Sequence, residues 1–107
     1  MQRITDKQLQ AIVDRINRTM GTPATPYKPY DPAVGRAQPN AKCYHLSHAY
    51  GGVSLHQMSE REGCTGARDV FGRGHMPKRE LAELMHAFLL AELMHAFLRG
   101  VDAGREG

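Results

Sequence analysis

The chain contains no tryptophan, only two cysteines and few aromatic residues, which make up 7% of its 107 residues. Cys43 and Cys64 are too few for the disulfide framework that stabilises many small secreted domains. No signal peptide is evident, so we expect free thiols in a reducing cytoplasm. No apolar run approaches the roughly 20 residues of a membrane span, and we expect no membrane partner.

The composition favours one small globular domain that comprises residues 1–107. Hydrophobic residues make up 41% of the chain and charged residues 23%, which is typical of globular proteins rather than disordered ones. Eleven glycines and six prolines leave a modest core, and such a chain often needs a partner subunit. The net charge of +3 permits contact with phosphates or acidic surfaces without requiring it.

A first helix is predicted over residues 6–20. Thr5 and Gln8 have the spacing of a capping box, and Ile4 with Leu9 has that of a hydrophobic staple. Gly21 stands where a left-handed C-terminal cap is expected. The apolar positions recur at helical spacing and form one stripe: Leu9, Ile12, Val13, Ile16 and Met20.

A proline-rich strap follows over residues 21–40. A proline stands at every third position, the period of a polyproline II helix, at Pro23, Pro26, Pro29 and Pro32. Tyr27 and Tyr30 share this period. One interpretation is a ligand for a groove that binds PxxP motifs. The other, which we favour, is a stiff strap across the domain with its tyrosines packed down.

The pattern from residue 43 to 58 predicts an antiparallel hairpin. Alternation places Tyr44, Leu46, His48 and Tyr50 on one face and Cys43, His45, Ser47 and Ala49 on the other. Gly51-Gly52 suits a two-residue turn, after which Val53 and Leu55 continue the first face. Residues 59–68 are predicted as a loop, and 69–71 as a short third strand.

The final helix contains one nine-residue phrase twice, because Leu81–Leu89 and Leu90–Leu98 are identical. A helix turns about 100° per residue, so the second copy directs its apolar face opposite to the first. The helix can run straight and offer its far half to a partner, break near residue 89, or carry a surplus copy. We favour a long helix that joins a homo-oligomer, followed by a flexible tail at 101–107. The predicted fold class is α+β.

Catalytic and metal-binding signatures are weak. Cys43, His45 and His56 can share a face of the hairpin, but the spacing matches no common zinc pattern. Ser47 and Ser54 lie near histidines, yet no nucleophile elbow is present. We therefore predict no enzyme activity, no metal and no cofactor.

Basic residues surround a glycine-rich approach to the final helix. A helix N-terminus presents free N–H groups and a positive dipole to anions, so we predict a site for a phosphate-bearing small molecule. Tyrosines nearby can stack on a base. The predicted ligand-binding residues are Tyr44, Tyr50, Arg68, Arg73, His75, Lys78 and Arg79. The alternative is a solvated basic loop without a ligand.

Several phrases together resemble small accessory proteins of tailed bacteriophages: ITDKQLQAIVDRINR, YHLSHAYGGVSLHQM, and KREL with a FLRG ending. In size and layout the chain is also similar to Thoeris anti-defence sponges. This resemblance implies a non-enzymatic protein in the cytoplasm of the infected host that sequesters a nucleotide immune signal. The alternative is an anti-CRISPR protein that binds a host nuclease effector. No helix–turn–helix spacing supports a third reading, a nucleic-acid-binding regulator.

Overall fold

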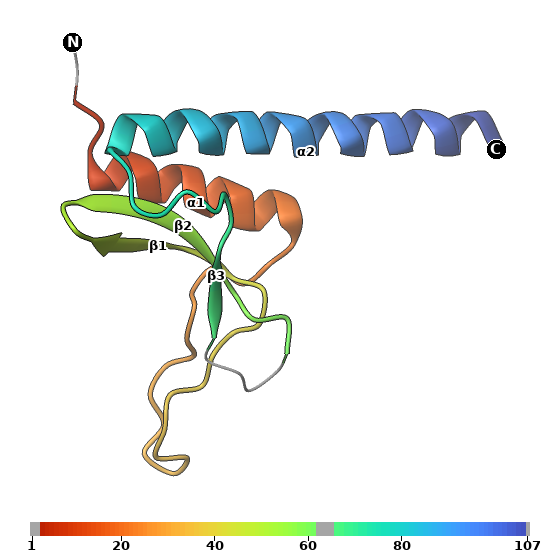
Figure 1. The fold of residues 1–107 in the computed structure, drawn as a ribbon. Helices are drawn as coiled ribbons and strands as arrows, with labels where there is room; N and C mark the ends of the chain where they lie inside the picture. The colour runs from red at the N-terminus through yellow and green to blue at the C-terminus, as the bar shows by residue number, and fades with distance from the viewer. Residues whose placement is uncertain (1–2, 62–65, 107) are drawn as a thin grey trace.

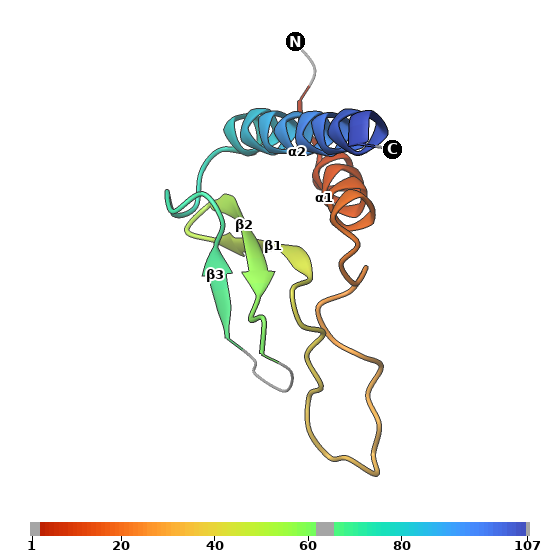
Figure 2. The same cartoon turned by 90° about the vertical axis from the view of Figure 1, so that its right-hand side faces the viewer.

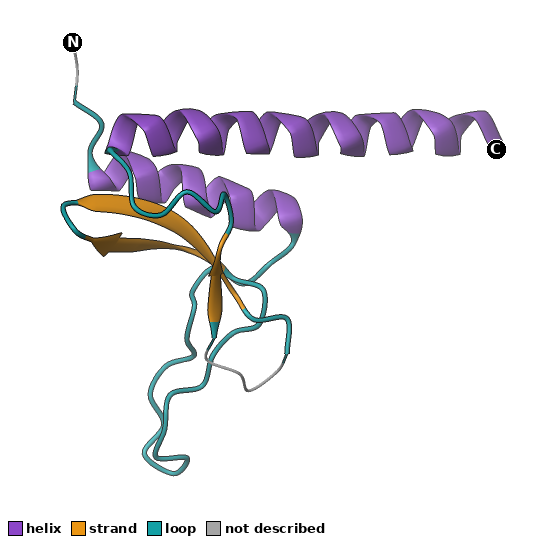
Figure 3. Ribbon diagram, in the orientation of Figure 1, coloured by secondary structure: helices purple, strands orange, loops and turns teal. Residues whose placement is uncertain are grey.

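The computed structural model describes residues 3–61 and 66–106, the last seven of these through their backbone. Its elements follow in the order α1 (Asp6–Met20), β1 (Tyr44–Ala49), β2 (Gly52–Met58), β3 (Ala67–Asp69) and α2 (Lys78–Glu106) (Figure 1). Figure 3 shows the two helices in purple above the strands in orange. The predicted α+β class is confirmed.

Helix α1 begins and ends where the sequence predicts. The backbone N–H of Gln8 donates to Thr5 Oγ1 at 3.1 Å, and the Thr5 N–H donates to Gln8 Oε1 at 2.8 Å. Gly21 has φ 71° and its N–H donates to the carbonyl of Asn17. Because both ends satisfy backbone groups that a helix leaves unpaired, the helix is bounded by local chemistry.

The three strands form an antiparallel sheet in the order β1-β2-β3. The hairpin is confirmed, but its turn is Tyr50-Gly51 rather than Gly51-Gly52, since Ala49 pairs with Gly52. Tyr50 and Gly51 have φ 54° and 73°, as a primed two-residue turn requires. Strand β3 also begins two residues earlier than predicted.

Gly52 lies in strand β2 and not in the turn, and the close approach of another segment requires a glycine there. A Cβ at this position would lie 3.0 Å from the backbone N and O atoms of Met76. Met76 forms an isolated antiparallel bridge with Val53, with N–H···O distances of 2.9 Å in both directions. The glycine therefore allows the segment before α2 to pack beside β2.

Both helices cover the same face of the sheet (Figure 2). This face carries Leu46, Val53 and Leu55, as the alternation predicts. The core between the layers also includes Leu9, Val13, Ile16, Tyr44, Leu81 and Met85. The opposite face, here called the outer face, carries His45, Ser47 and His56.

The proline-rich segment does not lie across the domain. Residues 21–40 form an arm that projects away from the helices and the sheet (Figure 1), tied at its base by a bridge between Tyr27 and Pro39. Tyr27 is 42% exposed and Tyr30 74% exposed, so the prediction that the tyrosines pack down is wrong. A turn at Asp31, whose carboxylate accepts the Ala33 N–H at 2.9 Å, reverses the chain within the arm.

Helix α2 is continuous over 29 residues, without a break near Leu89. The first copy of the repeat is in the core, while the second runs on past the end of α1 (Figure 1). The backbone remains helical through Glu106, beyond residue 101 where a tail was predicted. Gly107 lies outside the described residues.

We expect Asn17→Ala to lower the free energy of unfolding by about 3 kcal/mol, because buried polar groups left unpaired cost roughly 1–3 kcal/mol each. The buried Asn17 amide donates to the Tyr44 carbonyl at 3.0 Å and accepts the Tyr44 N–H at 2.9 Å. Urea unfolding measures the change. The control is Gln10→Ala, which removes an exposed contact with Asp14 and should change stability by less than about 0.5 kcal/mol. Equal effects of both variants would contradict this role of Asn17.

Candidate functional site

The predicted ligand-binding residues do not gather into one pocket. Tyr44 is only 4% exposed and packs against Phe88 with ring centroids 5.8 Å apart. Burial, the main cause, raises the pKa of its hydroxyl. Tyr44 is therefore a core residue, and its predicted role as a stacking surface is wrong.

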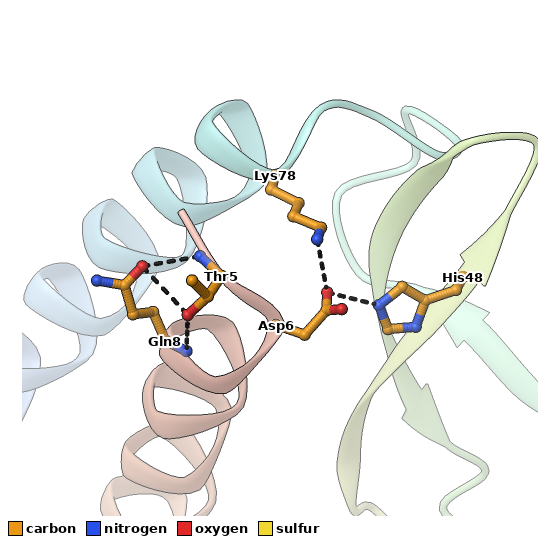
Figure 4. Close-up of polar contacts among 5 residues, drawn as sticks. All are labelled: Thr5, Asp6, Gln8, His48 and Lys78. Atoms are coloured by element: carbon orange, nitrogen blue, oxygen red, sulfur yellow. Dashed lines mark hydrogen bonds and ion pairs between the residues drawn. The ribbon is translucent and has the colours of Figure 1, made fainter. Parts of the chain in front are cut away.

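Lys78 is engaged by a carboxylate at the start of α1. Its Nζ lies 3.2 Å from Asp6 Oδ1, which His48 Nε2 also approaches at 3.2 Å (Figure 4). The contact with Lys78, followed by that with His48, lowers the pKa of the Asp6 carboxyl. The beginnings of the two helices and strand β1 thus meet at one aspartate, which offsets the charge of Lys78.

The arginines of the predicted site are spread over several elements. Arg68 in β3 donates from Nη2 to Gln57 Oε1 at 2.7 Å. Arg73 lies 3.9 Å from Glu80 at the first turn of α2, where Arg79 also lies. Because Arg68 and Arg73 contact separate groups, no single cradle of cations forms.

His75 and Tyr50, both predicted, lie together on the outer face. They are neighbours at one end of a line of four rings. The ring centroids are 5.9 Å apart for Tyr50 and His75, 6.1 Å for His75 and His56, and 5.9 Å for His56 and His45. We call these four residues the ring row. It is the most concentrated group of polar aromatic side chains in the described part of the chain.

Strand pairing explains how the ring row forms. His45 faces His56 directly across β1 and β2. The bridge between Met76 and Val53 places His75 next to Ser54 on the outer face. From there the His75 Nε2 reaches Ser47 Oγ at 3.2 Å.

Two buried polar atoms beside this face have no hydrogen-bond partner among the described residues: His45 Nε2 and Ser54 Oγ. Such atoms are rare in folded proteins, and each needs an explanation. His45 Nδ1 lies 3.4 Å from the Leu46 carbonyl, so Nδ1 is the natural site of the ring proton and Nε2 remains an acceptor. An unused acceptor and an unused hydroxyl are therefore buried beneath the outer face.

The His45 imidazole of the ring row carries little charge near neutral pH. Burial, the largest cause, lowers the pKa of this imidazole, and His56 contributes in the same direction. The neutral ring suits stacking and hydrogen bonding more than ion pairing.

The described residues give little support to metal binding or to nucleophilic catalysis. No group of three or more His, Cys, Asp or Glu side chains there is placed to hold a metal ion. Burial raises the pKa of the Cys43 thiol to about 11, so the thiolate that a nucleophile requires is scarce. Cys64 lies outside the described residues. Ser47 and His75 resemble part of a nucleophile–base pair, but no carboxylate bonds His75 in the residues described here.

A second surface lies on α2. The second copy of the repeat exposes an apolar stripe in which each side chain is 45–70% exposed: Leu90, Leu93, Met94, Phe97 and Leu98. Glu92, which the repeat turns toward the protein, shares a small cavity with Thr19 and Met20 of α1. The opposite orientation of the two copies is therefore as predicted, and the outward stripe has no cover in the described chain.

Sequence reasoning found Tyr50 and His75 but placed neither His45 nor His56 in the ligand site. Alternation did put His45 and Ser47 on one face, which was the available signal. The approach of His75 depends on the bridge between Met76 and Val53. No local pattern encodes that bridge, because it joins segments far apart in the chain.

Comparison with protein-family profiles, curated proteins and solved structures gives no match. The stretch Lys78–Arg99 of α2 is long and apolar enough to cross a membrane by length and composition, with a mean hydropathy of 1.4. Its first copy of the repeat forms part of the core around Leu81 and Met85.

We expect His45→Gln to reduce the loss of stability in acid. Burial holds the folded-state pKa of His45 below its unfolded-state value, so below about pH 6.5 the unfolded chain binds the proton more readily. Stability should therefore fall as the pH falls through that value, and less so in the variant. Urea unfolding at pH 8 and pH 5 measures both. His86→Gln on the exposed side of α2 is the control, and an unchanged pH dependence in His45→Gln would refute the argument.

We expect removal of one copy of the repeat to leave the monomer fold intact. Deleting residues 81–89 or 90–98 produces the same chain, because the copies are identical. The remaining copy supplies Leu81, Met85 and Leu89, so stability should change by less than about 1 kcal/mol. Thermal unfolding tests this, and a loss of several kcal/mol would show that the fold depends on both copies.

Proposed function

We propose that the protein is a non-enzymatic, phage-encoded anti-defence protein that captures a nucleotide immune signal on its ring row. The observation that carries the proposal is the row of four rings, with spacings of 5.9–6.1 Å, on a sheet face left free by the helices. The anti-defence role itself comes from the resemblance to small phage accessory proteins. Capture would lower the free concentration of the signal without any chemical step.

The ring row has the chemistry that a nucleobase requires. Imidazole and phenol rings stack on bases of any kind, at about 1–3 kcal/mol for each base. The part-buried Ser47 hydroxyl and His75 imidazole, whose Oγ and Nε2 atoms lie 3.2 Å apart, can bond polar edges of the ligand. His75 precedes the first turn of α2 by three residues, and the N–H groups and dipole of that turn favour a phosphate.

The apolar stripe supports assembly as part of this proposal. Monomeric proteins rarely expose large contiguous apolar patches, and such patches commonly mark interfaces. Leu90, Met94 and Phe97 are exposed by 57–70%. We propose that two copies pair through this stripe into a homo-oligomer, in which each copy keeps its own ring row open.

Substitution of Tyr50 by glycine separates binding from folding. Tyr50 has φ 54°, a region that glycine adopts freely, so Tyr50→Gly should raise stability by about 0.5–1 kcal/mol. The same change removes a ring that is 98% exposed and should weaken nucleotide binding about tenfold. Native mass spectrometry of protein from cells with an active cyclic-nucleotide defence identifies the ligand, and calorimetry measures its affinity.

The control is His86→Ala, since His86 is exposed on α2 away from the ring row. It should retain both nucleotide binding and protection of phage in plating assays. A protein isolated with no nucleotide, or one whose affinity is the same in Tyr50→Gly, would end the proposal for the ring row.

A second candidate is an inhibitor that binds a CRISPR nuclease effector. The exposed apolar stripe of α2 favours it, together with the projecting arm and its exposed Tyr30. This candidate expects a stable complex with the effector that Phe97→Glu disrupts and Tyr50→Gly leaves intact. The two variants therefore distinguish protein blockade from nucleotide capture.

A further inference from the structure

Strand β1 is an edge of the sheet, and a groove runs beside it. The sheet order β1-β2-β3 leaves one side of β1 without a neighbouring strand. The groove has a volume of about 480 Å³. It is lined by Asp6, Lys7 and Gln10 of α1, by Ala24 and Pro26 at the base of the arm, and by Tyr44, His45, Leu46 and His48 of β1.

The backbone of β1 presents hydrogen-bonding groups to this groove at alternate residues. Ala49 and Gly52 close the two-residue turn and therefore form a hydrogen-bonded pair, as do Ser47 with Ser54 and His45 with His56. The N–H and C=O groups of Tyr44, Leu46 and His48 consequently point outward. Among the described residues, one of the outward groups of Leu46 and His48 has a contact. This is the Leu46 carbonyl, whose oxygen lies 3.4 Å from His45 Nδ1.

Asn17 shows how this edge is bound when a partner is present. Its side-chain amide accepts the Tyr44 N–H at 2.9 Å and donates to the Tyr44 carbonyl at 3.0 Å. An amide that bonds both groups of one residue reproduces the contact of a neighbouring antiparallel strand. The contact ends at Tyr44, so the edge stays open at Leu46 and His48.

We propose that the β1 edge binds an extended peptide segment of a partner protein as a fourth strand. The proposal concerns the backbone edge of β1, so it goes beyond nucleotide capture and does not rest on it; His45 belongs to the ring row and also lines this groove. An added strand would bond the outward groups of Leu46 and His48, the usual basis of affinity in strand addition. The edge carries no proline or lysine within β1 to prevent such pairing.

The walls of the groove indicate the occupant. Residues of helix α1 and of the arm, among them Ala24 and Pro26, line the groove beside the edge, so a single extended chain fits better than the folded edge of a second copy. Asp6 is already engaged by Lys78 and His48, which leaves Lys7 as the charged lining residue without an ion pair in the described structure. The chemistry favours a segment in which apolar side chains alternate with acidic ones.

The test uses the full chain and a six-residue peptide of alternating valine and glutamate with blocked ends. Hydrogen exchange followed by NMR should show rapid exchange of the Leu46 and His48 amides in the free protein, relative to His45 and Ser47. The peptide should protect both outward amides by at least tenfold. A peptide with lysine in place of glutamate should bind several-fold more weakly.

His48→Pro removes one outward N–H, and because that N–H takes no part in the pairing of β1 with β2, the strand tolerates the change at an edge. It should weaken peptide binding at least tenfold. The matched control is His48→Ala, which loses the same contact with Asp6 but keeps the N–H and should bind normally. Failure of the peptide to bind, protection of amides elsewhere, or equal binding by the two variants would overturn the proposal.

Discussion

The covering of the sheet by helices on one face only is the constraint on which the rest of the structure depends. A small sheet must bury one apolar face, and α1 with the first half of α2 does this by packing on Leu46, Val53 and Leu55. No further element remains in the described chain to cover the other face. The outer face can therefore carry histidines and serines, which a second helical layer would have excluded.

The beginnings of the two helices and strand β1 meet at one carboxylate. Asp6 contacts both Lys78 and His48, each at 3.2 Å, and so joins α1, α2 and β1 (Figure 4). Exposed ion pairs contribute little stability individually, but this one holds the Lys78 ammonium beside Asp6. Within the ring row, burial lowers the pKa of His45, and a neutral ring there is suited to stacking.

Helical geometry then separates the surfaces that can bind partners. Nine residues are about two and a half turns, so one sequence phrase supplies core residues in its first copy and an outward stripe in its second. Leu81 is fully buried while its counterpart Leu90 is 59% exposed. The stripe on α2 is thus separate from the ring row and from the β1 edge, which share His45.

The sequence by itself determined the elements whose signals are local. Thr5, Gln8 and Gly21 mark the ends of α1 through hydrogen bonds with groups a few residues away. Alternation in β1 and β2 assigned each side chain to a face of the sheet. The continuous α2 and the opposite orientation of its two copies follow from the repeat and the helical period. Tyr50 and His75 were also named from sequence.

Tertiary structure decided the features that join distant segments. The turn lies at Tyr50-Gly51 because Ala49 pairs with Gly52. The close approach of Met76 to Gly52 places His75 near Ser47 and His56. Tyr44, predicted as a stacking surface, lies in the core against Phe88. The arm projects away from the domain rather than lying across it (Figure 1). These outcomes depend on which surfaces meet after folding, and spacing along a chain holds no information on a contact between residues that are far apart in it.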